Sequence, residues 1–486
     1  MRDSSTENEA SGLLHSRHDS SRKSDYRSTL EWNVEIDVKG EVNTGHEEEN
    51  GRFSFRKLMT YTGPDPGNLE SDLQVGSVAG YKLLWLLFWS HVAGLAIQIL
   101  SARLGVVTQN HLAQLIRSDI QEIIGTAIAL KIIFRLDLWV GVMITATDTF
   151  FFMFLQQYGV RKIEAFFITL IGVMIACFWI EMLSSNPSFQ MILKGILIPE
   201  LPEQAKVQAV GMVGAVIMPH NMFLHSALVM SRNLGKEPSK MKKKEANFYF
   251  AVESTIALFI SYLINLAIVV VFAQVFYDPG RIVTKLPGLY DASIVLSNTL
   301  GKSAKYFWAL GLLAAGQCST MTGTLAGQYV VEGFMGAIFK KQWHRVALTR
   351  AVALLPSMCV AVLAVDRFDT MGEILNVLQS LCLPTAIIPI LKLTSAEKIM
   401  TKTFKNSRLT NFLCWSISII VIIFNIYLFL NYLEDLDWPL YGVAFCILYL
   451  VFVIYLIYIP LNTPVQKEIE EVHSAIEEDI NYSGAE

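Results

Sequence analysis

The feature that most constrains this chain is the recurrence of apolar runs, each about as long as a membrane-spanning helix. A bilayer core needs about 20 mostly apolar residues in a helix. Such runs lie at about 82–106, 120–134, 138–157, 163–183, 207–230, 249–276, 305–335, 347–365, 371–392, 409–433 and 439–460. A broken apolar stretch, 57–80, precedes them. The sequence therefore predicts an all-α polytopic membrane protein with about twelve spans, two of them irregular.

The overall composition agrees with this class. Of 486 residues, 53% are hydrophobic, and the mean hydropathy of +0.42 is too high for a typical soluble domain. The net charge of -4 is small, and we expect no nucleic-acid partner. The six cysteines lie in apolar segments without paired spacing, which argues against a disulfide framework or a thiolate metal cluster. We expect no cofactor.

The polar segments outside the apolar runs predict the orientation of the chain in the membrane and its location in the cell. Residues 1–51 read as a disordered tail, and Glu9 with Leu13 and Leu14 has the form of an acidic-dileucine address for sorting adaptors. Lys and Arg concentrate in alternate loops, which predicts that both termini are cytoplasmic. We expect a transporter domain over 52–460, a cytoplasmic tail over 461–486, and an endosomal, lysosomal, vacuolar or plasma membrane.

Two spans are interrupted by polar residues and proline, at Asp65-Pro66-Gly67-Asn68 and at Met218-Pro219-His220-Asn221. Proline lacks a backbone donor and clashes with the preceding turn, so carbonyls are left free. In lipid this is tolerated only where protein or a cavity satisfies them. A pair of such breaks, one in each half of a many-span protein, is typical of a transporter's substrate site.

The breaks carry a mixed set of ligands. Asp65 offers a carboxylate, Asn68 an amide oxygen, and Met218 a thioether, while Pro219 frees the carbonyl of Ala215. Sulfur favours softer transition metals, whereas Mg²⁺ and Ca²⁺ prefer oxygen shells. The alternative for each break alone is a common turn, or a methionine that only packs.

Further ionisable residues lie inside the predicted spans. Asp119 and Glu122 share a helix face, and Arg350 is their natural partner. His220 and His225 flank the second break and could carry protons. The alternatives are a structural ion pair and neutral, packed histidines.

At these residues the sequence resembles the Nramp (natural resistance-associated macrophage protein) family. The resemblance runs from about Phe53 to about Tyr458. Its motifs are Gly63-Pro64, Asp65-Pro66-Gly67-Asn68-Leu69-Glu70, Asp119-Ile120-Gln121-Glu122, Met218-Pro219-His220-Asn221 with Leu224-His225-Ser226, and Gly316-Gln317-Cys318-Ser319-Thr320-Met321-Thr322-Gly323-Thr324.

The resemblance implies proton-coupled import of Mn²⁺, Fe²⁺ and similar divalent metals (Cd²⁺, Co²⁺ and Zn²⁺ among them) into the cytosol. It implies two inverted five-helix repeats, over about 52–183 and 207–392, with broken first and sixth helices and two further helices over about 409–460. The family's metal ligands match Asp65, Asn68, Ala215, Met218 and Asn376. The same resemblance assigns Asp119, Glu122 and Arg350 to the proton route.

The sequence departs from the family's pattern at two places. Pro64 abuts Asp65 directly, and Arg117-Ser118 runs straight into Asp119, where members have additional helix. Leu58 to Pro64 is only seven residues, about 10 Å of helix against a core of about 30 Å. The chain thus lacks part of the first and third spans. The alternative function is a non-transporting splice variant or a regulatory membrane protein that retains the metal site. An organic solute is disfavoured by Met218, and an enzyme by the lack of a nucleophile–base constellation.

Overall fold

The structure is a computed structural model that describes residues 66–113, 115, 169, 172, 175–176, 178–230, 238–278, 288–299, 301–309, 312, 315, 326–327, 329–330, 368–434 and 439–459. In this part of the chain the regular elements are helices. They are α3 (Pro66–Ala79), α4 (Leu84–Thr108), α9 (Phe189–Leu197), the short 3₁₀ helix η1 (Glu203–Ala205), α10 (Lys206–Ile217), α11 (Pro219–Met230), α12 (Lys240–Phe276), α13 (Leu289–Thr299), α16 (Phe368–Ser395), α17 (Glu397–Phe404), α18 (Arg408–Glu434) and α19 (Pro439–Tyr458).

Five stretches of the described chain are long and apolar enough to cross a membrane. They are Leu84–Thr108, Glu203–Met230, Lys240–Phe276, Asn376–Ser395 and Arg408–Tyr427. Each overlaps a span predicted from the sequence. The predicted runs at 120–134, 138–157 and 347–365 lie outside the described residues.

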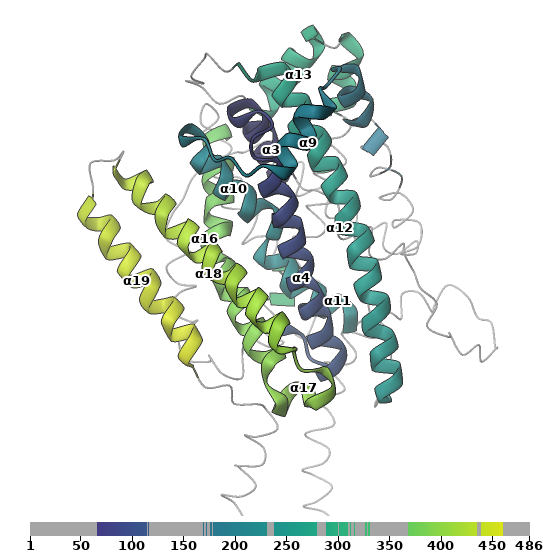
Figure 1. Ribbon diagram of the computed structural model, residues 1–486, viewed down its shortest axis with the longest axis vertical. Helices are drawn as coiled ribbons and strands as arrows, with labels where there is room; N and C mark the ends of the chain where they lie inside the picture. Colours follow the sequence, from purple (N-terminus) through teal and green to yellow (C-terminus); the bar gives the residue numbers. More distant parts are fainter. Residues whose placement is uncertain are drawn as a thin grey trace, which may run out of the picture.

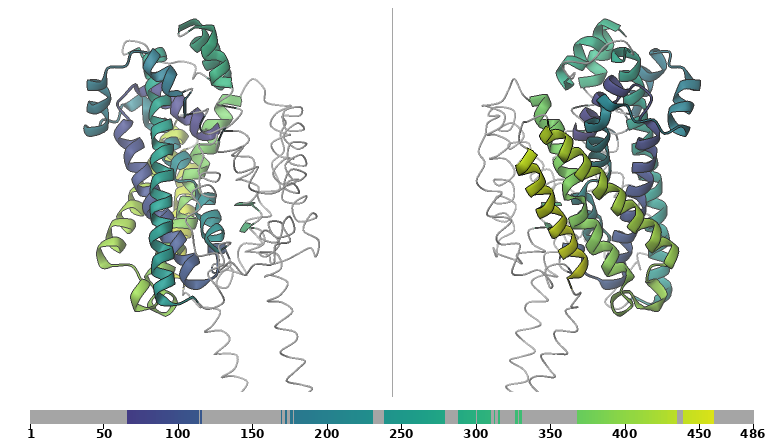
Figure 2. Two further views of the ribbon diagram at one scale, coloured as in Figure 1. Left: turned by 90° about the vertical axis from the view of Figure 1, so that its right-hand side faces the viewer. Right: turned by 60° about the vertical axis from the view of Figure 1, so that its left-hand side comes forward.

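The helices form one bundle in which α10 occupies the centre. α10 packs against α3, α4 and α16, while the long α12 lies along both α3 and α4. α11 packs on α4, and the pair α18 and α19 runs side by side along one edge, next to α16 (Figures 1 and 2). Both breaks found in the sequence therefore adjoin the middle of the bundle, since α3 begins at one and α10 ends at the other.

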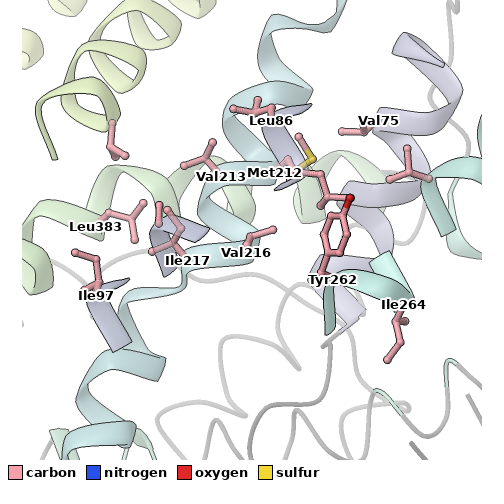
Figure 3. Close-up of a cluster of buried hydrophobic side chains, with 14 of the residues drawn as sticks. Val75, Leu86, Ile97, Met212, Val213, Val216, Ile217, Tyr262, Ile264 and Leu383 are labelled. Atoms are coloured by element: carbon pink, nitrogen blue, oxygen red, sulfur yellow. The ribbon is translucent and has the colours of Figure 1, made fainter. Parts of the chain in front are cut away.

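The core is built where these helices meet. Figure 3 shows Val75 of α3, Leu86 of α4, Met212 of α10, Tyr262 of α12 and Leu383 of α16 gathered in one buried cluster. The two edge helices differ, because many of their large apolar residues are exposed; examples are Phe412, Ile420, Leu448 and Tyr458. An exposed apolar belt of this size fits a protein whose solvent is lipid.

The helix α12 begins at Lys240, nine residues before the apolar run predicted at 249–276. Ser239 caps it, because the Ser239 side chain accepts a hydrogen bond from the backbone N–H of Lys242. The Lys243 ammonium also reaches the carbonyl of Val107, 3.0 Å away, near the end of α4. We call this end of the bundle, which α17 shares by packing on α4, the basic end.

At the opposite end, the turn between α3 and α4 is held from two sides. Lys82 pairs with Glu200 at 2.6 Å, and the indole N–H of Trp85 donates to the Glu200 carbonyl at 3.2 Å. The hydrogen bond to Glu200 raises the pKa of Lys82. α9 lies against the same turn, where a Cβ on Gly195 would strike the Tyr81 carbonyl.

The short helices α9, α13 and α17 lie in connections that the apolar runs did not mark as helical. α9 and α17 each span about two turns and bury only a few side chains, among them Ile192 of α9 and Met400 of α17. A search for spans of about 20 residues does not find elements of this length.

Candidate metal centre

The second break is a single-residue interruption between two helices. α10 ends at Ile217, α11 begins at Pro219, and Met218 between them has φ 38° and ψ 107°. The backbone N–H of Met218 still donates to Gly214, at 3.2 Å, and the N–H of Asn221 donates to the Met218 carbonyl, also at 3.2 Å. The break predicted from Pro219 is therefore present, and its geometry is held by hydrogen bonds on both sides.

This arrangement directs two potential ligands into the bundle. In an uninterrupted helix the carbonyl of Ala215 would accept the N–H of residue 219, which proline does not have. Ala215 and the Met218 side chain are both buried, at 1% and 4% exposure. The Met218 sulfur accepts a hydrogen bond from the Asn221 amide at 3.2 Å, so its lone pairs face a polar neighbour.

The helix α16 closes this region on another side. Asn376 is 2% exposed, and its carbonyl oxygen and its Cβ each lie against a glycine of α10. A Cβ built on Gly214 would stand 2.3 Å from the Asn376 carbonyl oxygen, and one on Gly211 would stand 3.7 Å from the Asn376 Cβ. The structure thus brings Asn376 to the same face of α10 that leads into the break.

The first break is described only from Pro66 onward. Pro66 opens α3, a position at which proline costs no hydrogen bond. Asn68, in the first turn, is 6% exposed, and α3 packs on both α10 and α16. Asp65 lies outside the described residues. The candidate ligands Asn68, Ala215, Met218 and Asn376 therefore come from three helices that contact one another.

The break lies beside the middle of α4, a helix long and apolar enough to span a membrane. Gly94 of α4 faces it, since a Cβ there would lie 4.0 Å from the Cα of Ile217. Gly94 follows Leu84, the first residue of α4, by ten positions, which is about 15 Å of helix rise. A bilayer core is about 30 Å thick. The C-terminal end of α10, with its partial negative charge, therefore lies about half a bilayer thickness from the start of α4, and it favours a cation there.

The predicted proton residues are only partly described. His225 is buried, and its Nε2 lies 3.2 Å from the hydroxyl of Ser254 on α12. His220 is half-buried in the first turn of α11. Asp119, Glu122 and Arg350 lie outside the described residues, so the grouping of these five stays a prediction.

Two features of the region were not singled out from the sequence. Gly211 and Gly214 let α16 approach α10, and their three-residue spacing in an apolar run was an available signal. His91 and Gln98, seven residues apart on α4, are both buried polar residues on one helix face. Such spacing in a span marks a face turned toward protein.

The comparisons with known proteins agree on one family. The model described as natural resistance-associated macrophage protein-like matches residues 58–121 and 116–431. The two matches meet near Asp119, where the sequence is expected to lack part of a span.

Several curated relatives are similar over most of their length. The metal transporter nramp1 homolog of Dictyostelium discoideum is 46% identical over 412 residues, covering 78% of this chain and 76% of the relative. Metal transporter Nramp2 of Arabidopsis thaliana is 44% identical, with 83% of each chain covered. Natural resistance-associated macrophage protein 2 of Mus musculus is 43% identical, covering 84% of this chain and 82% of the relative.

Among solved structures, the manganese transporter of Eremococcus coleocola, in complex with an aromatic bis-isothiourea substituted compound, superposes with a TM-score of 0.67. It is 28% identical, and 86% of this chain and 96% of that chain are covered. The expected all-α membrane fold with broken helices is confirmed by this match. The chain belongs to the natural resistance-associated macrophage protein (Nramp) family of metal transporters.

Proposed function

We propose that the protein imports divalent transition-metal ions into the cytosol, coupled to protons, with Mn²⁺ and Fe²⁺ as substrates. The observation that carries the proposal is the interruption at Met218, which leaves a buried thioether next to an Ala215 carbonyl that Pro219 deprives of its helical N–H partner. The names of the relatives and the manganese transporter of similar structure support the substrate class.

The ligand set supports a soft dication. In the described residues no three His, Cys, Asp or Glu side chains come together in a way that could hold a metal. The proposed ligands are instead the Asn68 amide, the Ala215 carbonyl, the Met218 thioether and the Asn376 amide, with Asp65 as the one carboxylate. A single charge also suits transport, because an ion that binds too tightly is not released.

Proton coupling follows from the same carboxylate. A metal bound at Asp65 disfavours a proton there, so occupancy by one ion and by the other are linked. Asp119, Glu122, His220, His225 and Arg350 are the proposed route for the displaced proton. Rocking of one helix bundle against the other then alternates access to the site.

The proposed orientation places both termini and the basic end in the cytoplasm. Lys243 and the basic helix α17 lie at the end of the bundle where α4 finishes, which supports the loop assignment made from the sequence. Endosomal or lysosomal delivery through Glu9, Leu13 and Leu14 belongs to the same proposal. Epitope tags read with and without permeabilisation test the orientation, and alanines at the two leucines test the delivery.

The decisive experiment is metal uptake by purified protein in liposomes. We expect Mn²⁺ uptake that accelerates with an inward proton gradient and is abolished in Asp65→Ala. If the protein binds Mn²⁺ but never transports it, the chain is the truncated or regulatory form instead, and the import proposal fails.

A matched pair of variants tests the thioether. Met218→Leu and Met222→Leu make the same change of similar volume in two buried methionines, one at the break and one in the packed face of α11. Met218→Leu should reduce the preference for Cd²⁺ over Ca²⁺ in competition with Mn²⁺, whereas Met222→Leu should keep it. Equal preference in both variants contradicts the assigned role of the sulfur.

A further inference from the structure

One face of α4 is lined by polar and small residues along the middle part of the helix. The residues recur at spacings of three and four, which places them on one stripe; they are His91, Gly94, Gln98 and Ser101. Gly94 abuts the end of α10, and the Ser101 hydroxyl donates to the Met222 carbonyl of α11 at 2.6 Å. The stripe therefore runs beside the second break, over about 15 Å of helix rise.

His91 begins the stripe, on the side of the break away from the basic end, and its tautomer is fixed by its neighbours. Its Nδ1 lies 2.8 Å from the carbonyl of Leu87. A carbonyl only accepts, so Nδ1 carries the hydrogen and Nε2 is the acceptor nitrogen of the ring. That nitrogen faces the side-chain amide of Asn265 on α12, 3.5 Å away, and the ring of Tyr262 stands edge-on at 5.4 Å.

Two buried side-chain oxygens, one on α12 and one on the α4 stripe, lack a hydrogen-bond donor among the described residues. Asn265 is fully buried, and Gln98 is 6% exposed. Within the described part of the chain, Oδ1 of Asn265 and Oε1 of Gln98 accept no hydrogen bond. Buried polar oxygens are commonly satisfied by ordered water. Water at Oδ1 of Asn265 would give the His91 ring a partner for proton exchange.

Two ionisable groups lie at the level of His91, one on α12 and one on α3. Tyr262 is the titratable residue that faces it from α12. From α3, the buried Asp72 lies one turn from Gly76, whose Cβ would meet the α12 backbone at Val269. Asp72 is therefore near the level of Asn265 along the bundle.

The other helices that pack on α4 add few charges at this level. α10 presents Ile217 to Gly94 of the stripe, and α16 places Asn376 against Gly214 of α10. On α11 the ring of His225 lies nearer the basic end, where its Nε2 is within hydrogen-bond distance of the Ser254 hydroxyl. Arg103, on α4 itself, is twelve residues beyond His91, about 18 Å of helix rise toward the basic end.

We propose that His91 is a proton-binding residue of the transport cycle and that the α4 stripe carries protons past the metal site. The inference rests on the proposed proton-coupled import. A hydronium ion beside the stripe gives its proton to Nε2 of His91, so an Nε2–H bond forms and a water molecule remains. The Asn265 amide turns over, and its Oδ1 accepts the new N–H.

The metal then drives the proton onward. His91 precedes Gly94 by three residues, so its ring lies on the order of 10 Å from the break. A dication that arrives at the break repels the imidazolium, and by linkage a proton on His91 disfavours the metal to the same extent. This proton, which is distinct from the one displaced at Asp65, returns to water beside the stripe and leaves toward the basic end along Gln98 and Ser101.

The test measures Mn²⁺ uptake and the accompanying proton influx in liposomes at several external pH values. His91→Gln keeps a polar side chain but removes the titratable ring. We expect at least a twofold fall in protons carried per Mn²⁺, while the KM for Mn²⁺ changes less than threefold. His111→Gln, which removes another buried histidine beyond the end of α4, is the matched control and should keep the wild-type ratio.

A second variant separates titration from structure. Asn265→Asp puts a carboxylate beside Nε2 and should move the midpoint of the pH profile to higher pH. A purely structural role predicts slower transport with an unmoved midpoint. Should either variant fail to transport, protons released on Mn²⁺ binding in detergent replace the uptake assay, and His91→Gln should release fewer.

The outcomes distinguish the two proposals. A wild-type protein without Mn²⁺ uptake overturns the proposed import. The role of His91 alone is overturned if the wild type couples Mn²⁺ to protons and either of two results is found. One is that His91→Gln keeps the wild-type proton ratio and proton release. The other is that Asn265→Asp leaves the midpoint of the pH profile unmoved.

Discussion

Gly214→Ala is the substitution whose effect can be worked out most directly from the packing around the break. A Cβ at this position would stand 2.3 Å from the Asn376 carbonyl oxygen and 2.7 Å from the Ser380 amide nitrogen. Both atoms are backbone, so no side chain can turn aside. Ordinary contact begins near 3.4 Å, and α16 must therefore retreat from α10 by about 1 Å.

The cost of this retreat can be bounded. Overpacking a tight contact costs about 1–3 kcal/mol, while replacing a helical glycine by alanine returns up to about 1 kcal/mol of helix stability. If Asn376 is a metal ligand, displacing it by 1 Å weakens binding further. We expect the KM for Mn²⁺ to rise by about 10- to 100-fold, equivalent to about 1.4–2.7 kcal/mol, together with a lower thermal unfolding midpoint.

Gly211→Ala is the control, because it lies one turn earlier on α10 and faces the same asparagine. There the added Cβ would meet the Asn376 Cβ at 3.7 Å, an ordinary contact. This variant should match or slightly exceed the wild type in thermal stability and keep its KM. Thermal unfolding in detergent and Mn²⁺ uptake in liposomes measure the two effects. If Gly214→Ala falls within twofold of Gly211→Ala in KM and unfolds at the same temperature, the argued contact between α10 and α16 is wrong.

Two further predictions concern the scaffold. Asn425→Leu removes the buried amide on α18 that donates to the Ser380 carbonyl at 2.7 Å and accepts from the Ser380 hydroxyl at 2.6 Å; the unpaired groups should cost about 1–3 kcal/mol, and an unfolding midpoint equal to the wild type would refute this. Lys82→Met removes the ion pair with Glu200. Because this pair raises the pKa of Lys82, its contribution to folding stability is complete below about pH 10.5. The contribution is lost as pH rises through the folded-state pKa. Because the pair is largely exposed, the wild type should exceed the variant by less than about 1 kcal/mol at pH 7, and a gap that widens above pH 11 would contradict the assignment.

The sequence alone was sufficient for the spans that the structure describes and for the second break. Runs of about 20 apolar residues have few alternatives in lipid, because an unpaired backbone group there costs several kcal/mol. Pro219 forbids one particular hydrogen bond, so the end of α10 could be placed to within a residue or two. α12 is longer than predicted because Lys240 to Phe248 are helical without being uniformly apolar, and the cap at Ser239 was the signal that could have marked its start.

The contacts between helices could not be read in the same way. Gly214 is small because Asn376, more than 160 residues later, passes close to it. A pattern within one segment carries no information about which residue of a distant segment arrives there. His91 shows the same limit, since a lone histidine in an apolar run is equally compatible with packing, and only the positions of Leu87 and Asn265 fix its tautomer.

The backbone at Met218 links local strain to the proposed chemistry. A non-glycine residue at φ 38° occupies a region that side chains disfavour, at a cost of order 1–3 kcal/mol. Glycine would adopt this conformation without that cost, so relief of strain does not explain the methionine. The hydrogen bonds to Gly214 and from Asn221 hold the break open around it. What methionine adds, and glycine lacks, is a buried sulfur next to the Ala215 carbonyl, and sulfur is the kind of ligand by which the proposed site would prefer a transition metal over Ca²⁺.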